Sequence, residues 1–68
     1  MVSIKIYLNH YHDKALIIDD NNKTYTIKKA SELDTKQVAL YYKTTIARMR
    51  EVVRLLKARG YVKGENYE

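Results

Sequence analysis

The spacing of the apolar residues changes near residue 30 of this 68-residue chain, and the change predicts two kinds of secondary structure. Over residues 3–9, and again over residues 24–27, apolar and polar residues alternate, which is the pattern of half-buried strands. Ile4, Ile6 and Leu8 share one face of the first such segment. Two further β-rich runs, over residues 15–18 and 24–27, are separated by turn-forming residues at 20–22. We therefore expect a β-hairpin or a three-stranded antiparallel meander within residues 1–29.

Residues 34–59 are predicted to form one long C-terminal helix. Asp34 is placed as its N-cap, with Gln37 three positions later as in a capping box, and Gly60 would end it. Residues 60–68 would form an extended tail. The apolar stripe expected to pack on the sheet comprises Val38, Tyr42, Thr45, Ile46, Met49, Val52, Val53 and Leu56. The predicted fold class is α+β in a single domain, a small antiparallel sheet followed by a long helix.

Two observations leave open a break within that helix. Leu40 and Leu55 lie well off the apolar stripe of a straight helix, so either the helix breaks or a partner covers them. Thr44 and Thr45 are the candidate break point, because threonine is a good N-cap and a mediocre residue inside a helix. A break there would divide residues 34–59 into a helix-turn-helix.

The size and composition of the chain favour a small soluble protein. A chain this short buries only about 60% of the surface that its unfolded form exposes, so its core is marginal. It contains no cysteine, which favours the cytoplasm over a secreted setting and leaves oligomerisation as the usual source of extra stability. We expect a cytoplasmic homodimer. No stretch has the length of a membrane span, and the first residues lack a signal-peptide pattern.

The net positive charge lies entirely in the second half of the chain. Residues 1–34 contain five lysines and five acidic residues, whereas residues 35–68 contain eight basic residues and three acidic ones, which accounts for the net charge of +5. Such segregation is expected where a protein meets a polyanion, although a solvated helix face is the plainer alternative. On the helical wheel, one exposed stripe is formed by Lys36, Lys43, Arg50, Arg54 and Lys57.

The segment over residues 38–62, VALYYKTTIARMREVVRLLKARGYV, resembles the helix-turn-helix core of winged-helix DNA-binding proteins. The resemblance lies in the spacing of the small and apolar residues and in the glycine that leads toward a wing. It implies that Thr45, Arg50 and Arg54 face the major groove of DNA. It also implies that Lys57 contacts a phosphate.

The leading functional hypothesis is a non-enzymatic DNA-binding protein that regulates transcription or replication through its basic C-terminal helix. RNA is an alternative ligand. The sequence has no glycine-rich phosphate loop, no nucleophile elbow and no acid–base constellation, so we expect neither catalysis nor a cofactor. The predicted DNA contacts are Lys36, Lys43, Thr45, Arg50, Arg54 and Lys57.

The rival hypothesis is a protein-binding role. Small inhibitors or adaptors of the kind that viruses and plasmids encode dock on larger host proteins, and a basic face could bind an acidic or nucleic-acid-binding site there. Leu40, Tyr41 and Leu55 would then anchor the partner or dimer interface.

The aromatic residues of the chain are seven tyrosines, with no Phe or Trp. Tyrosine has a polar tip that tolerates an interface or partial exposure, so aromatic surface contacts are expected. Tyr41 and Tyr42 could stack on bases, although Tyr42 belongs to the apolar stripe and is favoured as a core residue.

Two pairs of polar residues have simpler interpretations than a catalytic or metal site. His10 and His12 could ligate a metal in principle, but a third and a fourth ligand at suitable spacing are missing, so a polar loop is favoured and no metal is expected. Asp19 and Asp20 would stand at a hairpin tip, where they are expected to form the turn.

Overall fold

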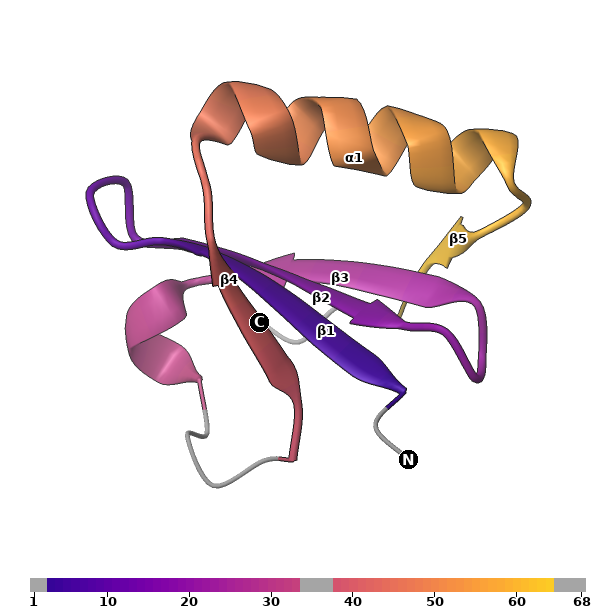
Figure 1. The fold of residues 1–68 in the computed structure, drawn as a ribbon, viewed down its shortest axis with the longest axis horizontal. Helices are drawn as coiled ribbons and strands as arrows, with labels where there is room; N and C mark the ends of the chain where they lie inside the picture. The colour runs from indigo at the N-terminus through magenta and orange to yellow at the C-terminus, as the bar shows by residue number, and fades with distance from the viewer. Residues whose placement is uncertain (1–2, 34–37, 65–68) are drawn as a thin grey trace.

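The computed structural model describes residues 3–33 and 38–64. Within these residues, five strands form one sheet, and a single α-helix packs on one of its faces (Figure 1). A short 3-10 turn lies between the third and fourth strands. The elements in chain order are β1 (Ile4–Asn9), β2 (Lys14–Asp19), β3 (Thr24–Lys28), η1 (Ala30–Glu32), β4 (Leu40–Lys43), α1 (Ile46–Ala58) and β5 (Val62–Lys63).

The strand order across the sheet is β4-β1-β2-β3-β5. β1, β2 and β3 pair as antiparallel neighbours in a meander, with Ile6 opposite Ile17 and Ile17 opposite Thr26. β4 runs parallel to β1 at one edge of the sheet, and β5 runs parallel to β3 at the other. β4, α1 and β5 therefore form a crossover that carries the chain over one face of the sheet from edge to edge.

The main core lies between α1 and the sheet face that carries Leu16, Ile18 and Tyr25. Burying a large apolar side chain of this kind contributes on the order of 2 kcal/mol. On the opposite face, Ile6 and Ala15 are completely buried, and η1 lies on that side of the sheet (Figure 1). The helix residues buried in the main core recur every three or four positions, as the helical period requires: Met49, Val52 and Leu56.

The predicted fold class, a small antiparallel sheet followed by one long helix, was wrong in two respects. The sheet is larger and mixed, because β4 and β5 add a parallel strand at each edge. The helix has 13 residues and does not span 34–59, because Leu40–Lys43 pair with β1. This segment contains tyrosines, which favour strands, and Tyr42 stacks on Tyr7 with ring centroids 5.2 Å apart. Pairing with the open edge of β1 thus outweighed the helical spacing of the segment.

The helix-turn-helix version of the prediction was also wrong, because the residues needed for its first helix form β4. Thr45 does mark the change of structure, and it serves as the N-cap of α1. Its hydroxyl oxygen accepts a hydrogen bond of 3.1 Å from the backbone N–H of Arg48. The capping box expected at Asp34 and Gln37 lies outside the described residues.

Gly60 ends the helix region as predicted. Its φ of 91° is a left-handed conformation that favours glycine. The N–H of Gly60 donates to the carbonyl of Lys57, and the N–H of Tyr61 donates to the carbonyl of Leu56, which together form a Schellman motif. The chain then continues into β5, which pairs with β3. The sequence predicted an extended tail here but not that it would join the sheet.

The turn between β2 and β3 is organised by Asp19, as predicted for a turn former. Its carboxylate accepts hydrogen bonds from the backbone N–H groups of Asn21 and Asn22 at 3.0 and 3.1 Å, and from the side chain of Asn22 at 2.8 Å. These bonds, the one from the Asn22 side chain above all, favour the charged carboxylate and lower the pKa of Asp19 below its ordinary value of 3.8.

Replacing Asp19 by alanine should lower the free energy of unfolding by about 1 kcal/mol or less, because solvent weakens these exposed bonds. A lowered pKa means that the stabilisation is present above the unfolded-state pKa and is lost as the pH falls through the folded-state pKa. Urea unfolding of the wild type and the Asp19→Ala variant should therefore differ at neutral pH, and the difference should shrink below pH 3.8. A difference that stayed constant in strong acid would contradict this role of the carboxylate.

Candidate nucleic-acid interface

α1 exposes every basic residue that it carries. In Figure 1 the helix forms the outermost layer on its side of the sheet. The stretch from Ile46 to the C-cap residue Arg59 contains one acidic residue, Glu51. Its exposed basic residues are Arg48, Arg50, Arg54, Lys57 and Arg59.

Three of these cations follow the outer side of the helix and one flank. Arg54 projects opposite the buried stripe, and the exposed residues Glu51, Ala47 and Ala58 share that outer side. Arg50 and Lys57 stand on the flank that lies toward β3, where Arg50 lines a shallow apolar cleft. We call Arg50, Arg54 and Lys57 the cationic stripe.

The cationic stripe is not neutralised by neighbouring acids. Glu51 pairs with Arg48 on the other flank, with Arg48 Nη1 2.8 Å from Glu51 Oε1. Among residues 3–33 and 38–64, no carboxylate lies within ion-pair distance of a stripe residue. The three charges therefore remain available to an anionic ligand.

The other predicted DNA contacts do not join this stripe. Lys43 is the last residue of β4 and belongs to the sheet face opposite α1, since its neighbour Tyr42 stacks on Tyr7 on the helix side. Thr45 lies at the start of α1, and its hydroxyl oxygen is engaged in capping. Lys36 lies outside the described residues.

The predicted partner-interface residues are all exposed, with relative accessibilities of 45% for Leu40, 40% for Tyr41 and 49% for Leu55. Two of them lie on the same side of the sheet. Leu40 is the β4 partner of Lys5 in the sheet, and Leu55 lines the same cleft as Lys5. Tyr41 belongs to the opposite face of β4, because side chains alternate along a strand.

A cleft of about 180 Å³ lies between α1 and β1, on the flank of the helix away from the cationic stripe. The sheet side of the cleft is formed by Lys5, Tyr7, Ile18 and Asp20, and Tyr61 closes the end beyond α1. The helix side is formed by Arg48, Val52, Leu55, Leu56 and Arg59.

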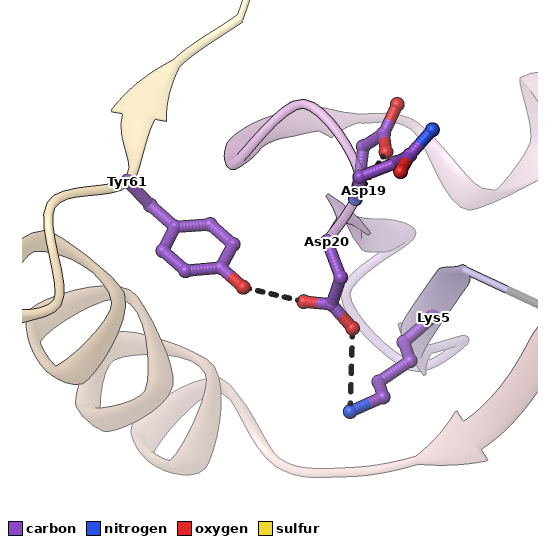
Figure 2. Close-up of polar contacts among 5 residues, drawn as sticks. Lys5, Asp19, Asp20 and Tyr61 are labelled. Atoms are coloured by element: carbon purple, nitrogen blue, oxygen red, sulfur yellow. Dashed lines mark hydrogen bonds and ion pairs between the residues drawn. The ribbon is translucent and has the colours of Figure 1, made fainter.

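A small polar network occupies the end of the cleft that lies near β5. Figure 2 shows Tyr61 reaching from the end of α1 toward Asp20, with Lys5 approaching the same carboxylate from β1. The hydroxyl of Tyr61 donates to Asp20 Oδ1 at 2.6 Å, and Lys5 Nζ is 3.5 Å from Asp20 Oδ2. The hydrogen bond to the Asp20 carboxylate raises the pKa of Tyr61 above its ordinary value.

Sequence reasoning did not find this cleft. Asp20 was assigned to turn formation together with Asp19, but its side chain points to Tyr61, which lies 41 positions along the chain. The alternation of β1 indicates only that Lys5 and Tyr7 share a face. No local pattern places that face beside the flank of α1.

Within the described residues, no group of three His, Cys, Asp or Glu side chains is placed to hold a metal ion. His10 and His12 lie in the exposed connection between β1 and β2, and the ring of His12 contacts Tyr11 edge-on. None of the helical segments described here has the length and apolar character needed to cross a lipid bilayer.

Comparison with known proteins found no relatives: no protein-family model matches the chain, and neither a curated protein nor a solved structure matches it. The arguments for function therefore rest on the geometry of this molecule.

The Tyr61–Asp20 hydrogen bond should stabilise the fold by joining the end of α1 to the β2–β3 turn. Tyr61→Phe retains the ring and removes the donor, so it should lower the free energy of unfolding at neutral pH. Because the folded-state pKa of Tyr61 is raised, the stabilisation is full below the unfolded-state pKa and is lost as the pH rises through the folded-state pKa. Urea unfolding of both proteins from neutral to strongly alkaline pH measures this, and an unchanged difference across the range would contradict it.

Proposed function

We propose that this chain is a small cytoplasmic DNA-binding protein that regulates transcription or replication without catalysing a reaction, and that α1 contacts duplex DNA. The observation that carries the proposal is the exposed, unneutralised cationic stripe of Arg50, Arg54 and Lys57 on the outermost element of the fold. A polyanion is the ligand that such a surface attracts most strongly.

The dimensions of α1 support entry into a major groove. An α-helix with its side chains is about 10–12 Å across, and the major groove of B-DNA is about 12 Å wide. The 13 residues of α1 form a rod about 20 Å long. Ala47 and Ala58 on its outer side would let the backbone approach the base edges closely.

The position of each cation suggests its role. Arg54 stands on the outer side of the helix, where a guanidinium can donate two hydrogen bonds to the O6 and N7 atoms of guanine. Arg50 and Lys57 stand on the flank, where phosphates line the rim of the groove. Arg54 would therefore contribute sequence preference, and the two flanking residues would contribute affinity.

Removing two of these charges tests the proposal. Arg50→Gln combined with Arg54→Gln should weaken binding to a mixed-sequence duplex at least tenfold at low salt. The slope of log affinity against log salt should become shallower by about 0.9, because Arg50 is the phosphate contact that is lost and each such contact accounts for about 0.9. Fluorescence anisotropy at several salt concentrations measures both quantities.

The matched control is Lys29→Gln combined with Lys63→Gln, which removes the same charge from exposed positions outside α1. Circular dichroism checks that the helix is retained in each variant. If the helix variant binds duplex with the affinity and the salt slope of the wild type, the proposed interface is wrong.

A protein-binding role is a second candidate, and the exposed residues of β4 favour it. All four residues of this edge strand are exposed, and they include Leu40, Tyr41 and Tyr42. Large apolar and aromatic side chains at a sheet edge are typical of protein contacts. A second copy of the chain or an acidic host protein would be the partner.

Self-association at β4 can be measured directly. If β4 forms a dimer contact, sedimentation equilibrium should show a dimer that persists near 1 M salt, where duplex binding is screened. Leu40→Lys should shift this dimer to monomer, whereas Lys29→Gln should leave it unchanged. A wild type that stays monomeric at millimolar concentration would exclude the homodimer.

A further inference from the structure

α1 leaves part of its sheet face uncovered. The helix packs on Leu16 and Ile18 of β2 and on Tyr25 of β3, so the parts of β1 and β4 on the same face lie beside it. The cleft of about 180 Å³ opens there, between the flank of α1 and β1. The cleft is lined by three kinds of polar or aromatic group: a tyrosine ring, several cations and one carboxylate.

The aromatic side of the cleft is formed by Tyr7, which packs against a neighbouring ring. Tyr7 lines the cleft, and its ring stacks on Tyr42 of β4 with the ring planes 28° apart. Stacking on an aromatic side chain is the interaction that unpaired bases make with proteins, and it does not depend on which base is present. Tyr7 is half-buried and also packs against the main core, so a base that entered the cleft would stack on the part of the ring that remains exposed.

The cations of the cleft come from two elements. Lys5 lies on β1, Arg48 lies in the first turn of α1, and Arg59 lies at the end of the helix. Arg48 uses one nitrogen to contact Glu51, and a guanidinium has further N–H donors. Among the described residues, no carboxylate lies within ion-pair distance of Arg59. These side chains can donate charge-assisted hydrogen bonds to a phosphate group.

The carboxylate of Asp20 adds an acceptor inside this positive rim. Tyr61 fixes its orientation through the 2.6 Å hydrogen bond to Oδ1. Lys5 Nζ stands 3.5 Å from Oδ2, which is too long for a strong hydrogen bond, so Oδ2 can still accept one from a ligand. Adenine, cytosine and guanine carry an exocyclic amine that can donate to a carboxylate, and thymine does not.

We infer that this cleft binds one unpaired nucleotide, with its base stacked on Tyr7, its amine directed to Asp20 and its phosphate held by Arg59 together with Lys5 and Arg48. The site lies on the flank of α1 opposite Arg50 and Lys57, so it goes beyond the duplex contact proposed above. The same chemistry serves a nucleotide within a single strand and a free mononucleotide, and the test separates the two.

The test uses the full-length protein and measures binding of oligo-dC and oligo-dT, each about eight nucleotides long, by fluorescence anisotropy. Binding of free dCMP is measured by calorimetry. We expect oligo-dC to bind more tightly than oligo-dT, and we expect Asp20→Asn to reduce that preference. Tyr7→Leu should weaken the binding of oligo-dC by about fivefold to 100-fold.

Arg59→Gln tests the cleft at an exposed position where folding is not at risk. It should weaken oligo-dC binding and reduce the salt slope by about 0.7, the value for one contact to a single strand. The matched controls are Lys63→Gln for the charge and Tyr11→Leu for the aromatic ring, because Tyr11 is 91% exposed in the β1–β2 connection. Both controls should bind as the wild type does.

Each outcome decides a part of the inference. Binding of dCMP with an affinity close to that of oligo-dC identifies a mononucleotide site, and much tighter binding of the oligomer identifies a strand. The inference is overturned if neither ligand binds, or if the cleft variants and their controls bind alike.

Equal affinity for oligo-dC and oligo-dT overturns the role of Asp20. The combined Arg50→Gln and Arg54→Gln variant separates the sites: it should bind duplex at least tenfold more weakly at low salt and retain the preference for oligo-dC.

Discussion

The packing of one amphipathic helix against one face of the sheet is the contact on which the rest of this structure depends. Met49, Val52 and Leu56 are buried against β2 and β3, and the described residues supply no second helix to share that face. Because the helical period allows only one side of α1 to be buried, this packing also decides which charges point away from the protein. One side of α1 therefore packs on the sheet, and the other side of the same helix forms the basic surface.

The connections at the two ends of α1 position that helix. β4 pairs with β1 directly before it, and β5 pairs with β3 directly after it, so α1 is tied to both edges of the sheet. Thr45 caps one end, and the Schellman motif at Gly60 closes the other. The bond from Tyr61 to Asp20 adds a side-chain link between the region after the helix and the β2–β3 turn. A helix held at both ends presents its side chains in a defined arrangement, which is what recognition of a regular polymer requires.

The two flanks of α1 differ in their surroundings, and this difference suggests two modes of contact. Arg50 borders an apolar hollow, and neither Arg50 nor Lys57 has a carboxylate within ion-pair distance among the described residues. Arg48 and Arg59 border a cleft that also contains an aromatic ring and a carboxylate. An isolated row of charges suits a phosphate backbone, whereas a cleft with a ring and an acceptor suits a base. The division of roles that we propose rests on the neighbours of each cation, since all of these cations are exposed.

Local patterns in the sequence were sufficient for several features. The alternation over residues 3–9 and 24–27 and the β-rich run over residues 15–18 indicated the strands β1, β2 and β3. The spacing from Ile46 to Leu56 indicated the helix face that packs on the sheet. The outward position of Arg50, Arg54 and Lys57 follows from that same spacing. Asp19 and Gly60 were recognisable because their roles depend on residues next to them in the chain.

Other features were decided by contacts between distant segments. Leu40–Lys43 became a strand because β1 offered an edge whose backbone groups needed partners, and no local pattern reports such an edge. The cleft joins Lys5, Asp20 and Arg59, which come from three separate parts of the chain. Helical periodicity is a property of neighbouring residues and can be read from the sequence by itself. Strand pairing and cleft formation depend on which segments meet after folding, so only the tertiary structure determined them.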